Sequence, residues 1–563
     1  MSYPQIVEYN AAVQDPRNTF TDPELRAGRV AETNLGLPLA LSGGFALTYT
    51  VQSGSKKFAV RCFHREVPQA QNRYAKISAK LRSLASPYFV NFEFQPQGIR
   101  VQRSHYPVVK MDWAEGETLG VYLDRVASNS GSVAALRQSF AALAEYLERN
   151  SIAHGDIQNE NVIVTKGGLR LIDYDGMFVV GLTEGQGTEV GHKHFQHPER
   201  RTQHFGPKID RFSFLVIDTS LEAVQADPSL YRKFREGGQA IIFKANDFAD
   251  PASSEVFRAL GGMPALRSSA AKLAAVCGAP LTSAPTLADF KNGINIPAAV
   301  ITRPTGASPK VAVVQAYIGA FPTIDAKDFD AVLRLVGHKI ELVGKVVSVK
   351  EGVGKRGRGK GLPYVFINFG VWNKESVKIT IWSEGLGNMS TRPTEAWVGK
   401  WISVTGLVEP PYEGKHYGRP YRSVGVTVDS DNQIIHLAER DAKFRLAGNR
   451  TQPQSKPKNA AILDEIFSGS PTGRAGTVTS SRPTAPPASP PLAAQTPPAA
   501  AKTKNEEILR QLQMAGSTMA QPNASHQNVP SAPTPIAEML SRIPPWVWIG
   551  GGFLLLLALL RGR

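Results

Sequence analysis

The chain contains little cysteine, few charged residues for its length and no apolar segment near its start. Two cysteines among 563 residues, Cys62 and Cys277, exclude a disulfide framework and a cysteine-based zinc site, and they fit a reducing compartment. The first 18 residues, MSYPQIVEYNAAVQDPRN, hold no apolar core, so we expect no secretory signal peptide. Charged residues make up only 20%, whereas glycine and proline number 50 and 40, which predicts long unfolded stretches between folded parts.

Enough apolar residues remain to build several domains. Hydrophobic residues make up 42% of the sequence, and at about 150 residues per domain the length suggests two to four of them. The net charge of +16 indicates an anionic partner without naming it. Composition divides the chain into an N-terminal extension (1–35), a globular region (36–300), a connector (301–337), a β-rich region (338–437), a linker (446–541) and an apolar end (543–560).

The linker at 446–541 is rich in Pro, Ala, Ser, Thr and Gln, as in RPTAPPASPPLAAQTPPAAA. It holds too little apolar surface to offset the entropy of ordering, so we expect disorder. Within it, residues 458–463 resemble residues 504–509, and each opens a short amphipathic stretch. Chance in a biased sequence is one explanation, and the other is a pair of docking motifs that become helical in a partner's groove.

The run from 543 to 560, IPPWVWIGGGFLLLLALL, has 18 uncharged residues between Arg542 and Arg561. This length is near the lower limit for a helix that spans a membrane, and its tryptophans suit the membrane interface. We therefore predict a single-pass C-terminal anchor, membrane localisation, and a cytoplasmic location for the rest of the chain. A helix buried in a protein core is the alternative.

A glycine-rich segment opens the globular region. The string LSGGFALTYTVQ starts at Leu41, and Gly43 and Gly44 would let the backbone approach phosphates closely. A plain hairpin turn is the common alternative for such a glycine pair. The strand-like run KKFAVRCF follows, and then an amphipathic helix around RYAKISAKLRSL.

Two acids and an amide with specific spacing follow later in the same region. In IAHGDIQNENVIV, Asp156 precedes Asn161 by five residues, and Asp173 lies in the apolar run LRLIDYDGM. A carboxylate at Asp156 can orient an attacking hydroxyl and accept its proton. The oxygens of Asn161 and Asp173 can hold Mg²⁺ against phosphates. The pattern predicts a phosphoryl-transfer site on loops bounded by strands.

Together these motifs resemble the protein-kinase superfamily, and in particular bacterial eukaryotic-like kinases with HGD in place of HRD. His197-Pro198-Glu199 stands where such kinases carry APE, and Asp210 opens a run like their D-x-W-S. The resemblance covers residues 36–300 and implies a bilobal fold, MgATP as the donor and a protein Ser or Thr hydroxyl as the acceptor. It implies catalytic roles for Asp156, Asn161 and Asp173, metal binding by Asn161 and Asp173, and nucleotide contacts from Gly43, Gly44, Arg61, Asp112, Asn161 and Asp173.

The sequence also departs from that family. Ala59-Val60-Arg61 places an arginine where the small-lobe lysine is usual, and the following helix offers no acid to pair with it. Lys56, Lys57 or Lys110 are possible substitutes for the lysine. Asp175, the second acid of DYDG, is expected to cap the following turn. A pseudokinase that binds nucleotide and acts as a scaffold or switch therefore remains the alternative to an active kinase.

The β-rich region at 338–437 shows five strand-like segments in an order that resembles an OB-fold, a small five-stranded barrel. Between Lys339 and Arg422 there are 14 basic and seven acidic residues, with aromatic residues interleaved. This composition favours binding of single-stranded nucleic acid, while anionic lipid is a rival ligand and burial of the aromatics in the core is the plain alternative. The densest basic cluster comprises Lys355, Arg356, Arg358 and Lys360.

These observations predict an α+β protein in which a bilobal kinase-like domain precedes a small OB-like barrel, a disordered linker and one C-terminal transmembrane helix. The predicted function is a membrane-tethered protein kinase that acts on a protein substrate. Sensing of nucleic acid by the barrel, reported by the kinase domain, is a third interpretation.

Overall fold

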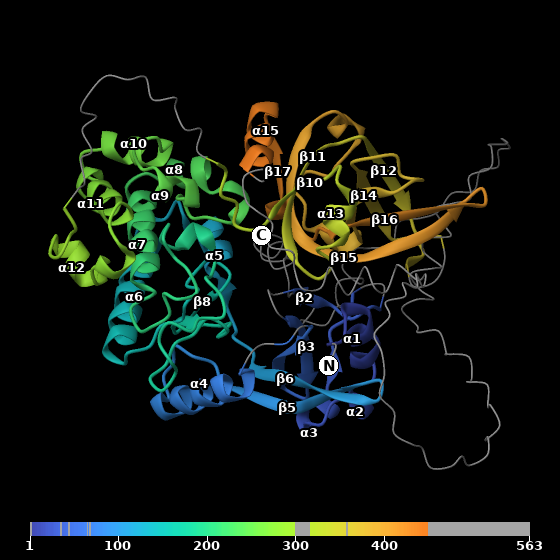
Figure 1. Ribbon diagram of the computed structural model, residues 1–563, viewed down its shortest axis with the longest axis horizontal. Helices are drawn as coiled ribbons and strands as arrows, with labels where there is room; N and C mark the ends of the chain where they lie inside the picture. Colours follow the sequence, from blue (N-terminus) through green and yellow to red (C-terminus); the bar gives the residue numbers. More distant parts are fainter. Residues whose placement is uncertain are drawn as a thin grey trace, which may run out of the picture.

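The computed structural model describes residues 3–33, 36–42, 46–64, 66, 69–298, 316–355 and 359–448. These residues form a mixed α and β structure with three sheets (Figure 1). An N-terminal sheet, coloured blue, adjoins a mainly helical region coloured green, and a second large sheet, coloured orange, lies beside both.

The N-terminal sheet has the strand order β1-β3-β4-β6-β5, with β2 paired to β3, and every pairing is antiparallel. Its strands are β1 (Arg29–Val30), β2 (Ala40–Ser42), β3 (Ala46–Ser53), β4 (Lys56–Phe63), β5 (Phe92–Val101) and β6 (Ser104–Asp112). Four helices accompany it: α1 (Ile6–Val13), α2 (Pro16–Thr19), α3 (Pro23–Arg26) and α4 (Ala70–Leu84).

Alternation along β4 decides which side chains reach the rest of the molecule. Successive residues of a strand point to opposite faces. Phe58, Val60 and Cys62 accordingly pack in a core with α1 and α3. Ala59 and Phe63 pack in the core shared with α4 and the helical region. Arg61 is two residues from each of Ala59 and Phe63, so it shares their face of the strand. Its side chain is therefore directed toward the helical region.

The helical region is built on two antiparallel-packed long helices, α6 (Ser130–Arg149) and α7 (Arg211–Ala226). Apolar residues of α6 recur every three or four positions, including Val133, Leu136, Phe140 and Leu143, and all are buried. The small sheet of this region contains β7 (Glu117–Thr118), β8 (Val162–Thr165) and β9 (Gly168–Leu171). The shorter helices are α5 (Leu119–Val126), α8 (Pro228–Phe234), α9 (Ala245–Ala249), α10 (Glu255–Gly262), α11 (Arg267–Cys277) and α12 (Leu287–Asn292).

The third sheet follows the path β10-β11-β15-β16-β14-β13-β12, with β17 paired to β15. Its strands are β10 (Thr323–Asp325), β11 (Lys339–Lys345), β12 (Ser348–Val353), β13 (Pro363–Asn368), β14 (Ser376–Ile381), β15 (Trp401–His416), β16 (Arg419–Thr427) and β17 (Ile434–Leu437). Helices α13 (Phe329–Leu333), α14 (Ser383–Gly387) and α15 (Glu439–Gly448) accompany them. We refer to the described residues within 316–448 as the barrel region, after the barrel predicted from the sequence for residues 338–437.

The run KIELVGKVVSVK, which reads as one strand, is two strands in the structure. β11 pairs with β15, whereas β12 pairs with β13. The change of partner occurs where the Val346 N–H donates to the Lys400 carbonyl and the Val347 N–H donates to the Asn368 carbonyl. β11 and β12 are therefore consecutive in the chain but lie at opposite ends of the strand order β11-β15-β16-β14-β13-β12.

The helices that the structure describes contradict two predictions. These are the transmembrane helix and the membrane localisation that was inferred from it. Within those ranges no helix is long and apolar enough to cross a membrane. The 20-residue α6 buries one apolar face in protein and exposes charged side chains, Glu145 and Arg149, which are 66% and 68% exposed. The run 543–560 lies outside the described residues. The predicted fold class is corrected to a mixed α and β structure with several sheets.

Candidate active site

The loop that contains Asp156 is anchored to the start of α7. The Asp210 carboxylate accepts hydrogen bonds from the backbone N–H groups of His154, at 2.5 Å, and Gly155, at 2.8 Å. The ring Nε2 of His154 lies 2.9 Å from the carbonyl oxygen of Ile172. The loop before Asp156 is thereby joined to both α7 and the segment that leads to Asp173.

Gly155 occupies a position that no other residue fits. Its φ is +83°, in the left-handed region that side chains disfavour. A Cβ built there would overlap the carbonyl oxygen of Gly176. The arginine found at this place in HRD kinases is therefore excluded by backbone geometry, which accounts for the HGD sequence.

Hydrogen bonds join Asp156 and Asn161. The Nδ2 of Asn161 donates to Asp156 Oδ2 at 2.9 Å and to the Asp156 carbonyl at 3.0 Å. The other carboxylate oxygen, Oδ1, accepts the backbone N–H of His192 at 2.7 Å. Burial raises the pKa of Asp156 to about 7, against the opposing effect of the His192 N–H. A carboxyl with this pKa is suited to accept a proton near neutral pH.

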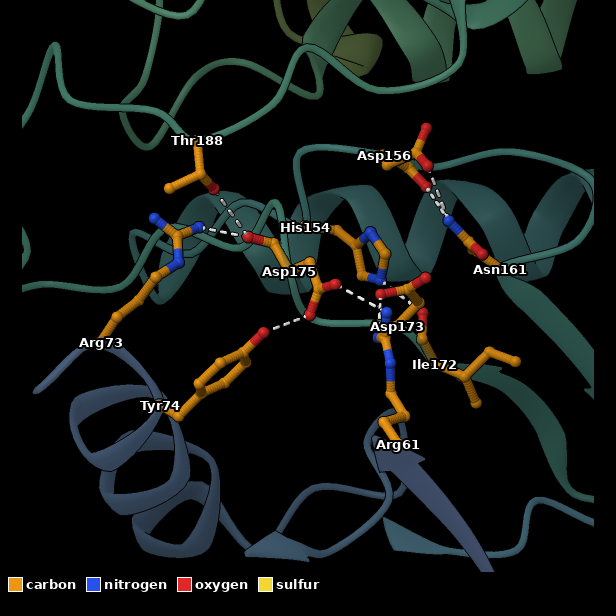
Figure 2. A network of polar contacts seen from close by, with 10 residues as sticks. All are labelled: Arg61, Arg73, Tyr74, His154, Asp156, Asn161, Ile172, Asp173, Asp175 and Thr188. Carbon is orange, nitrogen blue, oxygen red and sulfur yellow. Dashed lines mark hydrogen bonds and ion pairs between the residues drawn. The ribbon is translucent and has the colours of Figure 1, made fainter. Parts of the chain in front are cut away.

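Arg61 forms ion pairs with both acids of the DYDG segment (Figure 2). Its Nη1 donates to Asp173 Oδ1, and its Nη2 donates to Asp175 Oδ2 at 2.6 Å. The Arg61 side chain is only 5% exposed and that of Asp175 only 8%. Burial alone would raise the pKa of Asp173, but the Arg61 guanidinium holds it below its ordinary value, so Asp173 is ionised.

Asp175 supplies the acid that α4 lacks. The hydroxyl of Tyr74, on α4, donates to Asp175 Oδ1, and Arg73 on the same helix donates to the Asp175 carbonyl at 2.6 Å. Figure 2 shows α4 reaching Asp175 from one side while Arg61 reaches it from another. Asp175 was expected to cap a turn. It instead connects α4 to Arg61, through Tyr74 and Arg73 of that helix.

The lysines considered as substitutes lie elsewhere. Lys110 pairs with Asp22 and Glu24, which belong to the N-terminal segment, and Lys56 also pairs with Glu24. Lys57 lies over the ring of Trp113, at 4.1 Å from its centroid. None of these three contacts brings a lysine to Asp173.

The remaining predicted nucleotide contacts are not part of this cluster. Asp112 ends β6 and accepts a hydrogen bond from Asn91 Nδ2 at 3.0 Å. Gly43 and Gly44 lie outside the described residues. The cluster thus contains Arg61, Asp156, Asn161 and Asp173 out of the seven predicted site residues.

The structure adds groups that sequence reasoning did not identify. Burial raises the pKa of Glu189 well above its usual value, and the carboxylates of Asp175, Asp173 and Asp156 raise it further. The Oε1 of Glu189 lies close to Gly176, the neighbour of Asp175 in the chain, so Glu189 is a fourth acid at the site. No motif marks Glu189, His192 or Tyr74 in the sequence, because each reaches the site only through folding of the chain.

The residues present fit a magnesium ion held between protein and phosphates. Asn161 uses its Nδ2 on Asp156, so its carbonyl Oδ1 is the atom it would offer a metal. Asp173 is ionised and half-exposed, and Arg61 engages only one of its oxygens. In the described part of the chain no group of three or more His, Cys, Asp or Glu side chains is arranged to hold a metal. Mg²⁺ in proteins usually takes one or two ligand oxygens from side chains and its remaining ligands from phosphates and water.

Comparison with known proteins gives a distant, partial similarity to serine/threonine protein kinases. The chain is 26% identical over 125 residues to serine/threonine-protein kinase PAK 1 of Mus musculus, which covers 21% of this chain and 22% of that protein. It is 27% identical over 127 residues to serine/threonine-protein kinase max-2 of Caenorhabditis elegans, which covers 22% of this chain and 19% of that protein. No family model matches the chain.

These matches span only about a fifth of the length of either relative. They confirm the predicted resemblance to protein kinases at that coarse level. They do not test the OB-fold resemblance or a bacterial origin.

Proposed function

We propose that this protein transfers the γ-phosphoryl group of ATP to a Ser or Thr hydroxyl of a protein substrate, with residues 36–300 as the kinase-like domain. The observation that carries the proposal is the joint arrangement of Asp156 with Asn161 and of Asp173 with Arg61. The distant similarity to two serine/threonine protein kinases supports it. The roles of these residues rest on the chemistry of the site.

Each side chain has a role that its contacts suit. Asp156 would accept the proton of the attacking hydroxyl, since its raised pKa places it near neutral pH. Asn161 and Asp173 would hold Mg²⁺, which when bound offsets the negative charge of the phosphates. Arg61 would hold Asp173 in place through their ion pair. The hydroxyl oxygen would bond to the γ-phosphorus as its bond to the bridging oxygen of ADP breaks. ADP departs, and the proton of the hydroxyl passes to Asp156.

Two substitutions test the proposal in the full-length protein. Asp173→Ala should abolish Mg²⁺-dependent ATP binding, measured by calorimetry, because it removes the charged metal ligand. Asp156→Asn should leave ATP binding within about twofold but lower phosphate transfer by about 10²-fold or more. Asp330→Asn, an exposed acid on α13, serves as the matched control and should change neither.

A specific contact favours the second candidate, a pseudokinase that binds nucleotide without turnover. Arg61 is engaged by two carboxylates, so its charge is already neutralised before any phosphate arrives. If the wild-type protein binds MgATP but transfers no phosphate to itself or to generic acceptors, the pseudokinase is the correct function. If it binds no nucleotide with or without Mg²⁺, both proposals fail.

We further propose that the barrel region is an OB-like barrel that binds single-stranded nucleic acid. Along the sheet, β11 and β12 follow each other in the chain yet stand at opposite ends of the order β11-β15-β16-β14-β13-β12, which supports the first part. Trp372 is 42% exposed and Tyr417 is 88% exposed, and the Trp372 ring lies 5.8 Å from that of Tyr421. Lys355 and Lys360 are exposed as well, whereas Arg356 and Arg358 lie outside the described residues.

Exposed rings and basic side chains are the elements by which proteins stack bases and neutralise phosphates. Trp372→Ala should therefore weaken binding of labelled oligo(dT) by about tenfold in a fluorescence-anisotropy titration. Absence of wild-type binding to single-stranded DNA and RNA at low salt would refute the nucleic-acid proposal.

A further inference from the structure

The barrel region contacts the loop that carries the proposed catalytic acid. Phe321 precedes β10, and its ring stands edge-to-face against the ring of His192, with 5.7 Å between centroids. His192 is the residue whose backbone N–H donates to Asp156 Oδ1. One aromatic contact therefore separates the barrel region from the proposed catalytic acid.

A second contact reaches the same loop from β11. Lys339 Nζ lies 3.3 Å from Glu160 Oε2 and 4.8 Å from the centroid of the Phe321 ring. Glu160 immediately precedes Asn161 in the loop. The Lys339 and Glu160 side chains are 24% and 56% exposed, so solvent screens this ion pair and it contributes little. The Phe321 ring is then the larger part of the contact.

Further hydrogen bonds hold the segment before Phe321 on the helical region. Asn246 of α9 accepts the backbone N–H of Ile318 at 2.8 Å and donates to the Ala316 carbonyl at 2.8 Å. A later part of the barrel region also contacts the helical region, because Arg235, which follows α8, donates to Asn432 Oδ1 at 3.0 Å. On the other side, Leu407 packs against the core of the N-terminal sheet. The barrel region thus contacts both parts that form the site, as the arrangement in Figure 1 shows.

We propose that docking of the barrel region through Phe321 and Lys339 holds His192 and the Asp156 loop in their working arrangement, so that phosphate transfer depends on barrel docking. This regulation rests on the function proposed above for the same site. Phe321 and Lys339 are positioning residues, because they act on Asp156 only through His192 and Glu160. Any ligand or modification that lifts the barrel region from the helical region would then lower activity.

The main test compares the wild type with Phe321→Ala and Lys339→Ala in the full-length protein. Displacement of a reacting group by about 1 Å can cost 10²-fold in rate. We expect Phe321→Ala to lower kcat about tenfold while the KM for ATP changes less than twofold, with a smaller loss for Lys339→Ala. Lys345→Ala, at the exposed far end of β11, is the matched control and should keep wild-type transfer.

A pH profile separates positioning from a general loss of structure. The His192 N–H favours the ionised form of Asp156, so its loss should move the acid limb of the rate profile to higher pH. The other charged groups that act on Asp156 remain in these variants: Asp173, Asp210, Glu189 and Arg200. A change that merely unfolds part of the protein would lower the rate without moving this limb.

Hydrogen exchange provides a readout that does not depend on catalysis. The His192 backbone amide should exchange at least about tenfold faster in Phe321→Ala than in the wild type or in Lys345→Ala. If the wild type transfers no phosphate, the proposed function fails, and the amide exchange alone then decides whether the barrel region positions this loop. Unchanged exchange at His192, or unchanged or raised transfer in Phe321→Ala, would overturn the positioning proposal.

Discussion

Substitution of Arg61 by lysine restores the residue that protein kinases usually carry, yet the structure predicts a loss. Arg61 uses two different nitrogens, Nη1 on Asp173 and Nη2 on Asp175. A lysine offers one compact ammonium on a shorter side chain and cannot reproduce this fork. If the ammonium stays with Asp173, Asp175 is left buried with the Tyr74 hydroxyl as its remaining side-chain donor among those described here.

The magnitude follows from the contact that is lost. A hydrogen bond to a charged group contributes about 1.5–3 kcal/mol, so we expect Arg61→Lys to lower the free energy of unfolding by about 2 kcal/mol. For a domain of this size each kcal/mol lowers Tm by about 2–4 °C, which predicts a shift of about 4–8 °C. Arg61→Ala removes both contacts and leaves Asp173 and Asp175 without their cation, so its loss should be larger, about 3–5 kcal/mol.

Differential scanning calorimetry of the full-length protein measures the shift, and ATP-binding and transfer assays run on the same samples. Lys56→Arg, at an exposed position on the same strand, is the matched exchange and should stay within about 0.5 kcal/mol of the wild type. Adding Asp175→Asn to Arg61→Lys should recover part of the loss, because it removes the buried charge that lysine leaves unpaired. A higher Tm or faster transfer in Arg61→Lys would refute this account of the ion-pair network.

Two further predictions concern the loop that holds Asp156. Since burial raises the pKa of Asp156 to about 7 and only the ionised form accepts a proton, kcat should fall as pH drops through about 7; an acid limb near pH 4 would show that Asp156 is not the base. Gly155→Ala should destabilise the protein by about 3 kcal/mol or more in a thermal melt, because strain at positive φ is joined by overlap with Gly176. Gly54→Ala has a similar φ of +58° but open space around it, so it should cost about 1 kcal/mol, and equal effects of the two substitutions would contradict the overlap argument.

Local chemistry was readable from the sequence where the groups concerned are close along the chain. Asp156 and Asn161 are five residues apart on one loop, and the hydrogen bond from Asn161 Nδ2 to Asp156 Oδ2 brings their side chains together. Their catalytic roles remain predictions. The strand KKFAVRCF was also predictable, because period-two alternation needs only neighbouring residues. The division of the chain at 36–300 and 338–437 remains a prediction. The membrane anchor was inferred from an apolar run alone, and the helices of the described ranges do not support it.

The sequence by itself indicated Asp156, Asn161 and Asp173 as polar side chains of a candidate site. It could not show what those groups would pair with, since the partners come from distant segments that meet only when both cores form. Arg61 meets Asp175 across 114 positions, and Tyr74 meets it across 101. Gly155 is required because the backbone of Gly176 folds against it, and Phe321 reaches His192 because the barrel region docks on the helical region. Burial then decides the charge state of each group, because the cost of desolvating a carboxylate depends on what surrounds it in three dimensions.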